Sequence, residues 1–199
     1  MLKRKKGKGF SLIELLIVVA IIGIIAAIAI PNMLSAIQKG RQKRTMGDMK
    51  SLGTTIETVQ TDCSAYPSDT NVGTNCATPG SLMQGLTKGG WLQNPILCDG
   101  WRTLFLYGDA AATGGKTVTI SDPNCLAVFT TWQNTYGLLS KGRDVTVDCG
   151  MPTFNAKTGT YQSSGSCTGA STCAGHNRFD CDISFAGGQF VAFPEGMQK

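Results

Sequence analysis

The N-terminal apolar run constrains this chain more than any other feature. It extends from Phe10 to Ile30, contains 21 residues with a single charge, and ends just before Pro31. As an α-helix it measures about 31 Å, close to the ~30 Å hydrocarbon core of a bilayer. We therefore expect a helix that spans a membrane, with the rest of the chain folding beyond it.

Two details distinguish this run from an ordinary membrane anchor. A signal peptide is cleaved after its apolar region, whereas here the small residue Gly9 comes before it. The carboxylate of Glu14 lies inside the run, where a lone acid costs about 2.5–3.5 kcal/mol, so Glu14 is a functional candidate; the alternative is a side chain that snorkels to the interface. Residues 1–9 contain no acid and five cations: Lys3, Arg4, Lys5, Lys6 and Lys8.

The segment Lys8-Gly9-Phe10-Ser11-Leu12-Ile13-Glu14 resembles the prepilin peptidase motif of type IV pilins and type II secretion pseudopilins. The resemblance implies cleavage after Gly9, N-methylation of Phe10, and pairing of Glu14 with the terminal amine of a neighbouring subunit. A buried carboxylate beside a cationic amine is less costly than one left alone. The resemblance also implies the α+β pilin fold, in which a long hydrophobic, then amphipathic helix packs on a small antiparallel sheet with long disulfide-stapled loops.

The rest of the N-terminal segment fits a helix that packs on other helices. Ala20, Gly23 and Ala27 share one stripe, which favours close helix contact, although small residues are also simply common in such segments. Pro31 lacks a backbone donor and should kink or open the helix. We therefore expect a leader at 1–9, a membrane or filament-core helix at 10–30, an amphipathic continuation at 31–61 and a head domain at 62–199. The apolar face of the continuation is formed by Met49, Leu52, Ile56 and Val59.

Charge excludes one class of partner. The chain carries a formal net charge of +5, but removal of the leader leaves 13 basic residues against 13 acidic ones. No nucleic-acid partner is indicated by overall charge. The cations between Gln38 and Arg44 either touch anionic lipid headgroups, at about 1 kcal/mol per cation, or form a solvated helix face.

The cysteines place the head outside the cytoplasm. All eight follow the apolar run, and an even set favours disulfides in an oxidising compartment. Eight cysteines allow 105 pairings; short separations favour Cys63–Cys76 and Cys167–Cys173. Zinc is disfavoured because the chain has no C-x-x-C and a single histidine, His176. The disulfide candidates are Cys63, Cys76, Cys98, Cys125, Cys149, Cys167, Cys173 and Cys181.

The sequence predicts that the head is a loop-rich α/β domain. The long helix should end near residues 61–63, residues 63–80 should form a loop, and Ser81 should cap a short helix over residues 82–88. Residues 155–177 are rich in Gly, Ser and Thr and are expected to form an exposed loop. The predicted strands are Thr103–Tyr107, Lys116–Ile120, Cys125–Thr131, Thr135–Leu139 and Gln189–Phe193.

Short blocks beyond the apolar run also resemble major pseudopilins, in the same order along the chain: Met49–Glu57, Tyr66-Pro67, Gly85-Leu86, Gly90-Trp91-Leu92, Asp99-Gly100-Trp101 with Tyr107, Tyr136–Asp144 and Asp180–Ile183. The resemblance implies that a calcium ion is possible, since major pseudopilins often bind calcium in the segments that match Ser140–Asp144 and Asp180–Asp182. Carboxylate oxygens are preferred calcium ligands, so aspartates here could supply some of them. However, Lys141 and Arg143 depart from the family pattern, so disulfides are an alternative staple and the acids are alternatively ordinary turn residues. The calcium candidates are Asp144, Asp148, Asp180 and Asp182.

An enzyme is not indicated. Gly114-Gly115-Lys116-Thr117 resembles the end of a phosphate-binding loop, but Ala110 stands where that motif needs glycine. His176 has no nucleophile elbow to serve. We expect a structural filament subunit that needs no cofactor, first as a major pseudopilin of type II secretion. The alternatives are a type IV pilin for adhesion, motility or DNA uptake, and a tethered binding module that never polymerises.

The resemblance also implies partners and a location. The partners are further copies of the chain, the prepilin peptidase, an inner-membrane assembly platform and minor pilins or pseudopilins. The subunit should cross the inner membrane once, with its N-terminus in the cytoplasm and its head in the periplasm. It then enters a periplasmic pseudopilus or an extracellular pilus.

Overall fold

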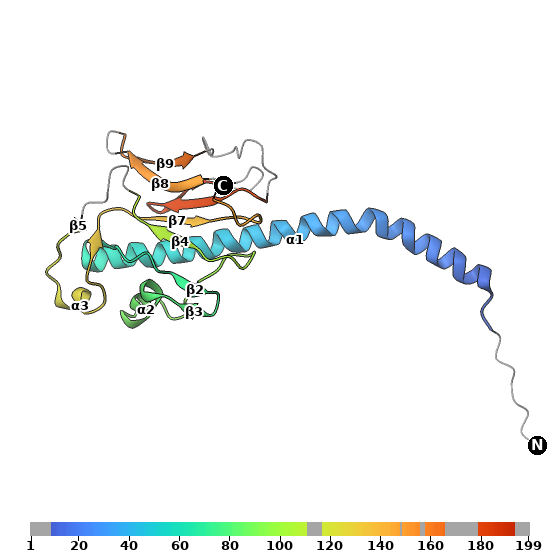
Figure 1. The fold of residues 1–199 in the computed structure, drawn as a ribbon, viewed down its shortest axis with the longest axis horizontal. Coiled ribbons are helices and arrows are strands. Elements are labelled where there is room, and N and C mark those ends of the chain that lie inside the picture. The colour runs from blue at the N-terminus through green and yellow to red at the C-terminus, as the bar shows by residue number, and fades with distance from the viewer. Residues whose placement is uncertain (1–8, 111–116, 148, 156–157, 166–178, 194–199) are drawn as a thin grey trace, which may run out of the picture. The chain divides into compact units, whose positions relative to one another are not determined.

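The computed structural model describes residues 9–110, 117–147, 149–155, 158–165 and 179–193. The chain divides into two compact units, Met1–Lys39 and Gly40–Lys199. The elements of the described residues are, in order, α1 Leu12–Cys63, β1 Tyr66–Pro67, β2 Gly73–Asn75, β3 Thr78–Pro79, α2 Ser81–Lys88, β4 Leu106–Gly108, β5 Thr117–Val118, α3 Pro123–Leu126, β6 Trp132–Gln133, β7 Gly137–Ser140, β8 Cys149–Asn155, β9 Thr160–Gly165, β10 Ile183–Ala186 and β11 Gln189–Ala192 (Figure 1).

The first unit consists of the N-terminal part of α1. This helix is long and apolar enough to cross a membrane, and its large apolar side chains from Leu12 to Ile30 are exposed. The helix continues through Pro31 instead of ending there. The side-chain amide of Asn32 donates to the Ile28 carbonyl at 3.2 Å, one turn earlier.

The second unit contains the hydrophobic core. Met49, Leu52, Ile56 and Val59 of α1 are fully buried, which confirms the amphipathic face expected from their spacing. They belong to one cluster with residues from α2 and from the strands β7 and β10, among them Leu82, Leu86, Leu138, Ile183 and Phe185. The latter half of α1 therefore serves as the central support of the head (Figure 1).

One glycine permits a close approach between helix and sheet. A Cβ at Gly53 of α1 would lie 2.1 Å from Cε1 of Phe185 in β10. The Phe185 ring is itself buried and packs edge-on against Phe190, with ring centroids 5.0 Å apart. A missing side chain on the helix thus makes room for an aromatic ring from the sheet.

The main sheet has four strands in the order β11-β10-β7-β4, with every neighbouring pair antiparallel. In its centre Leu138 of β7 pairs with Tyr107 on one side and Phe185 on the other. A second sheet has the order β1-β6-β5, and two further pairs, β2-β3 and β8-β9, complete the described sheets. This architecture confirms the predicted α+β class.

Four of the five predicted strands have counterparts, each shifted or shortened at its ends: β4, β5, β7 and β11. The predicted strand at 125–131 is wrong, because this stretch begins with the helix α3. Asp122 caps α3 by accepting a hydrogen bond from the Asn124 amide at 2.8 Å, and Pro123 occupies the first helical turn. These start signals outweigh the β propensity of the residues that follow.

Three other local predictions need correction. The expected loop at 155–177 contains the strand β9, in which Tyr161 pairs with Phe154 of β8; the remainder from 166 lies outside the described residues. The loop at 63–80 contains the short strands β1, β2 and β3. The helix near residue 82 exists as α2, but its N-cap is Gly80, without a side-chain cap, and Ser81 is already helical.

Candidate assembly site

The predicted cleavage point lies just outside α1. Gly9, Phe10 and Ser11 have no regular secondary structure, and α1 begins at Leu12. The side chain of Phe10 is 86% exposed. A protease needs an accessible, non-helical peptide bond, and the bond between Gly9 and Phe10 has both properties in this structure.

Glu14 has a local partner that the sequence-based reasoning missed. Its Oε2 accepts a hydrogen bond from the backbone N–H of Ser11 at 2.9 Å. Ser11 precedes the first helical residue and Glu14 is the third helical residue, which is half of a capping box. A carboxylate at this place also interacts favourably with the helix dipole. The pattern Ser-x-x-Glu in front of an apolar run was the available signal. In a single subunit Glu14 therefore stabilises the start of its own helix.

The small-residue stripe is open in the isolated chain. Ala20, Gly23 and Ala27 are all exposed, and a Cβ added at Gly23 would meet no atom within 4 Å. Close helix contact along this stripe stays a prediction, since the large apolar side chains of the same segment are exposed as well.

The disulfides join segments that the short-separation argument did not. Cys63 is bonded to Cys125, which ties the end of α1 to α3, so the pairing Cys63–Cys76 is wrong. Cys76 is bonded to Cys98 instead. Cys63 is buried at the end of its helix, whereas Cys76 lies in the exposed β2-β3 turn, and the fold separates them. Cys181 is disulfide-bonded as well. Cys167 and Cys173 lie outside the described residues, as does the side chain of Cys149.

The calcium candidates do not converge on one site within the described residues. Both oxygens of Asp180 accept hydrogen bonds from the guanidinium of Arg143, at 2.7 and 2.9 Å. Asp144 is exposed and accepts from the Thr146 amide, while Asp182 is fully buried. The described part of the chain has no group of three or more His, Cys, Asp or Glu side chains that could hold a metal; Asp148 lies outside it. Arg143 thus occupies the carboxylate that a cation would need.

The enzyme-like motifs gain no support. Residues 111–116 and His176 lie outside the described residues. Thr117, the last residue of the glycine-rich stretch, begins the strand β5 and not a helix. A phosphate-binding loop requires a helix at this position, because the helix N-terminus helps to bind the phosphate.

A buried group of aromatic rings fastens α1 to the sheet β1-β6-β5. The Tyr66 hydroxyl donates to Glu57 Oε2 of α1 at 2.9 Å, and the Tyr107 hydroxyl donates to the Pro67 carbonyl at 2.6 Å. The rings of Tyr66 and Tyr136 lie 4.8 Å apart. Desolvation by burial raises the pKa of Tyr66, Tyr107 and Tyr136 above the usual value, and the carboxylate of Glu57 adds to the effect for Tyr66 and Tyr136. These tyrosines are neutral structural groups.

Comparisons with known proteins agree with the motif at the N-terminus. Residues 4–30 match the prokaryotic N-terminal methylation motif, and residues 32–122 match the family of type II secretion system protein G. The chain is similar to a type IV major fimbrial protein FimA of Dichelobacter nodosus, with 39% identity over 58% of this chain and 62% of that protein.

Two type II secretion system core proteins G are also similar over shorter segments. The protein from Pseudomonas aeruginosa is 34% identical over 34% of this chain and 47% of its own length; that from Vibrio cholerae is 36% identical over 34% and 46%. The chain thus spans between 46% and 62% of the length of these relatives. No solved structure gives a significant match.

The matched segments include the residues of the candidate assembly site. The methylation motif covers the exposed Gly9–Phe10 bond and the apolar part of α1, and the protein G match covers the amphipathic part of α1 and the first elements of the head. The chain thus carries the prokaryotic N-terminal methylation motif and a segment that matches the type II secretion system protein G family, and its relatives include type II secretion proteins G and type IV fimbrial proteins.

Proposed function

We propose that the chain is a structural filament subunit that assembles through its N-terminal helix. One observation carries this proposal: the apolar side chains of α1 from Leu12 to Ile30 are exposed in the single subunit, directly after an accessible cleavage point. So much apolar surface must be covered by lipid before assembly and by neighbouring helices afterwards.

The proposed maturation follows from the N-terminus. A prepilin peptidase cleaves after Gly9, and the new terminal residue Phe10 is methylated. Cleavage removes residues 1–9 and creates a cationic amine four residues before Glu14. In the filament Glu14 exchanges its capping bond with Ser11 for the amine of a neighbouring subunit. The small residues Ala20, Gly23 and Ala27 then let the helices approach closely.

The head, residues 62–199, forms the outer surface of the filament in this proposal. Subunits related by one repeated head-to-tail contact produce an open fibre, which is how a single chain type makes a filament. Before assembly the subunit crosses the inner membrane once, with the disulfide-bonded head in the periplasm. Its partners are further copies, an inner-membrane assembly platform and minor subunits.

The function that we propose first is that of the major pseudopilin of a type II secretion system. It is supported by the protein G match over residues 32–122. The second reading is a type IV pilin, favoured by the fimbrial relative, whose similarity extends over 116 residues at 39% identity. The remaining class is a membrane-tethered module that does not polymerise.

Deletion of the gene in the native host separates the two filament readings. Surface fibres are scored by electron microscopy, together with the distribution of exported proteins between periplasm and medium. Trapped exoproteins with normal fibres support the pseudopilin, and lost fibres with normal secretion support the pilin.

A Glu14→Ala variant tests the filament class itself. Both filament readings predict that this variant enters the membrane and is cleaved but fails to assemble. Full function of Glu14→Ala, with no polymer formed by the unaltered chain, would contradict the proposal in favour of the tethered module.

A further inference from the structure

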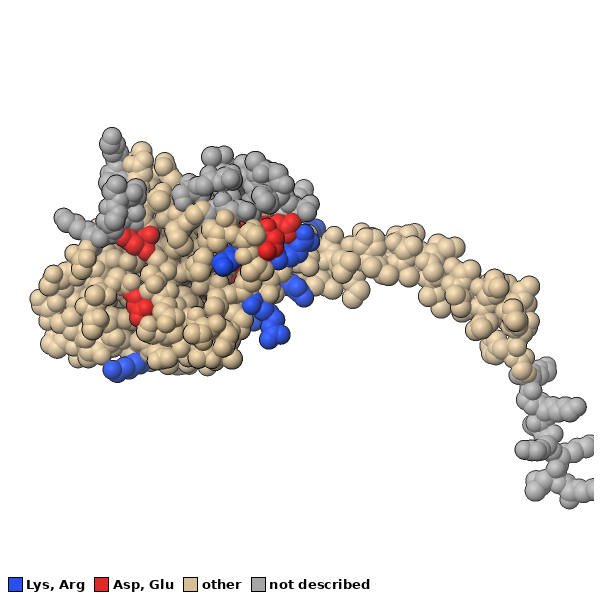
Figure 2. Space-filling view, viewed as in Figure 1, with Lys and Arg blue, Asp and Glu red and all other residues tan. Residues whose placement is uncertain are grey.

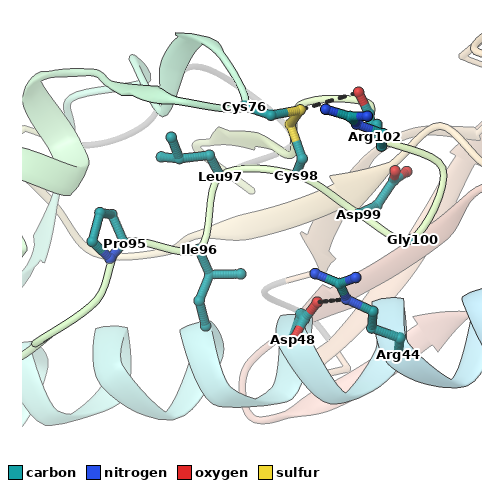
Figure 3. A pocket seen from close by; sticks show the side chains of 10 residues that line it. All are labelled: Arg44, Asp48, Cys76, Pro95, Ile96, Leu97, Cys98, Asp99, Gly100 and Arg102. Atoms are coloured by element: carbon teal, nitrogen blue, oxygen red, sulfur yellow. Dashed lines mark hydrogen bonds and ion pairs between the residues drawn. A yellow bond between two sulfur atoms is a disulfide. The ribbon is translucent and has the colours of Figure 1, made fainter.

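Two adjoining clefts lie where α1 meets the loop that follows Cys98. One has a volume of about 510 Å³ and is walled by Pro95, Ile96 and the Cys76–Cys98 disulfide. The other, of about 420 Å³, includes Arg41 and Trp101. Both are lined by Arg44, Gly100 and Arg102. Figure 3 shows Arg44 rising from α1 on one side of the first cleft and Arg102 on the loop opposite.

The loop is built rigidly around the carboxylate of Asp99. This side chain is 3% exposed and accepts hydrogen bonds from the amides of Trp101 and Thr103, each at 2.9 Å, and from the hydroxyl of Ser140 at 2.7 Å. The hydroxyl of Thr103 is a further donor. The disulfide of Cys98 holds the residue immediately before Asp99. A loop fixed in this way presents its outer side chains in one geometry.

The same loop is seated directly on the helix backbone. The Gly100 amide donates to the hydroxyl of Thr45 at 2.8 Å, and that hydroxyl donates to the Arg41 carbonyl at 3.0 Å. A Cβ at Gly100 would lie 2.3 Å from the Arg41 carbonyl oxygen, so only glycine permits this contact. Arg41 and the loop are therefore held together by the fold.

Arg102 is kept in an unfavourable backbone conformation. Its φ is +68°, in the left-handed region that glycine adopts without cost. A non-glycine residue held there by its surroundings is a reason to look for a function. The side chain of Arg102 is exposed, so packing does not explain why arginine stands at this position.

The positive charges of the clefts are poorly neutralised within the described residues. Arg44 has one ion pair, with Asp48 at 3.4 Å, and its side chain is 73% exposed. The carboxylate of Asp99 is committed to its own loop. No ion pair is recorded for Arg41 or Arg102 in the described part of the chain. Figure 2 shows Lys and Arg side chains gathered at this end of the second unit, with Asp and Glu side chains beside some of them.

Three arginines line the second cleft, and this favours an anion with several oxygens as its ligand. Arginine binds phosphate through paired N–H donors, and a partly buried tryptophan beside it is typical of a membrane interface. The exposed apolar residues of α1 extend beyond Ile30 through Met33, Leu34 and Ile37. In sequence the cationic cleft therefore begins four residues after the last exposed apolar side chain.

We propose that Arg41, Arg44 and Arg102 bind the phosphate of an anionic lipid headgroup while the subunit is still in the membrane. This inference rests on the proposed function, which places α1 across the bilayer before assembly. Before assembly, the bound headgroup fixes how deeply the subunit sits in the membrane and how the head is oriented on its surface. Extraction into the filament then requires the cleft to release the lipid.

Carboxylates of a second copy are the competing ligand. The acidic side chains at the other end of the head are already engaged within their own chain, which weakens this alternative. Asp62 accepts from Trp91, Asp69 from the Asn71 amide, Asp109 from Thr135 and Asp122 from the Asn124 amide.

The test measures lipid binding to the full chain in detergent micelles by native mass spectrometry, with phosphatidylglycerol as the titrated probe. Arg102→Gly should weaken binding about tenfold or more, as expected for loss of a hydrogen-bonded charge. Glycine also relieves the left-handed strain, so the melting temperature should not fall, and lost binding cannot be ascribed to misfolding. Arg102→Lys, which keeps the charge without the paired donors, should give an intermediate affinity.

Lys43→Gln is the matched control. Lys43 is exposed on the same turn of α1 as Arg41 and Arg44 but lines neither cleft. Its loss should weaken binding less than about fivefold, the effect of one diffuse surface charge. An equal loss for Lys43→Gln and Arg102→Gly would overturn the cleft in favour of unspecific attraction.

Two other probes separate the sources of the phosphate. Phosphatidylcholine should bind at least about tenfold more weakly than phosphatidylglycerol, and millimolar inorganic phosphate should not displace the lipid. Equal affinity for both lipids, or displacement by free phosphate, refutes a site for anionic headgroups.

Unchanged lipid binding by Arg102→Gly, together with lost subunit crosslinks in the filament, assigns the cleft to a second copy and also refutes the proposal. Assembly plays no part in the lipid titration. A failure of the proposed function therefore appears separately, in the Glu14→Ala assay.

Discussion

Replacing Gly53 with alanine should destabilise the head, although alanine is the better helix former. Alanine gains about 1 kcal/mol over glycine inside a helix. At Gly53 the new methyl group would lie 2.1 Å from the ring of Phe185, well inside contact distance, and that ring is buried against Phe190. Displacing a packed ring costs about 1–3 kcal/mol or more. Because the overlap is severe, we expect a net loss of about 1–2 kcal/mol.

Gly47 of the same helix is the matched control, because a Cβ there would meet no atom within 4 Å. Gly47→Ala should therefore stabilise the protein by about 0.5–1 kcal/mol. For a domain of this size each kcal/mol shifts the melting temperature by about 2–4 °C, so the two substitutions should move it in opposite directions.

The assay is thermal and urea unfolding of the full chain in detergent, followed by near-ultraviolet circular dichroism. Gly53→Ala combined with Phe185→Leu should recover part of the loss, since leucine removes the atoms that clash. The close packing of α1 on β10 would be refuted if Gly53→Ala raised the melting temperature as much as Gly47→Ala.

Three further predictions concern the head. Asp99→Asn keeps an acceptor for the two loop amides but replaces the charged acceptor of the Thr103 and Ser140 hydroxyls by a neutral NH2 donor, so the free energy of unfolding in urea should fall by about 1–3 kcal/mol. A loss below about 0.5 kcal/mol contradicts the role of Asp99 in the loop. Because burial raises the pKa of Tyr66, Tyr107 and Tyr136 above 10, their stabilising effect is complete below pH 10 and is lost as the pH rises toward the folded values. Above pH 10 the ionisation of each of these tyrosines should lower the free energy of unfolding by up to about 1.4 kcal/mol per pH unit. Tyr66→Phe should therefore make the fall of the unfolding free energy with pH shallower in urea titrations at pH 9, 10 and 11. A fall as steep as in the unaltered chain counts against the burial argument. Arg143→Gln should lower the free energy of unfolding by about 1–2 kcal/mol, a low value for a charged pair because the Arg143 side chain is 43% exposed. The melting temperature of the unaltered chain should be the same in calcium chloride and in a chelator. A rise of several degrees with calcium would show that a cation, and not Arg143, binds the carboxylate of Asp180.

The N-terminal half of the molecule was predictable because its signals are local. An apolar run of bilayer length and the stripe of Met49, Leu52, Ile56 and Val59 follow from residue type and spacing, whereas the α+β class was implied by the family resemblance. The hydrogen bond between Ser11 and Glu14 is equally local, since the pattern Ser-x-x-Glu before an apolar run is the sequence signature of a capping box.

The head was less predictable because its contacts join distant segments. Short strands such as β1 and β6 consist of two residues each, too few for a period of two to be recognised. The stretch after Asp122 was assigned to a strand from its residue types, whereas a cap and a proline start a helix there.

The sequence by itself determined the processing motif, the apolar helix, its amphipathic continuation and an oxidised head, since each depends on residues a few positions apart. Only the tertiary structure decided that Cys63 bonds Cys125 and Cys76 bonds Cys98, that Arg143 satisfies Asp180, and that Arg102 faces the same cleft as Arg41 and Arg44. The physical reason is that a pairing between cysteines 22 or 62 residues apart depends on how the intervening loops close. Loop closure costs so little extra for a longer loop that sequence separation does not select the partner.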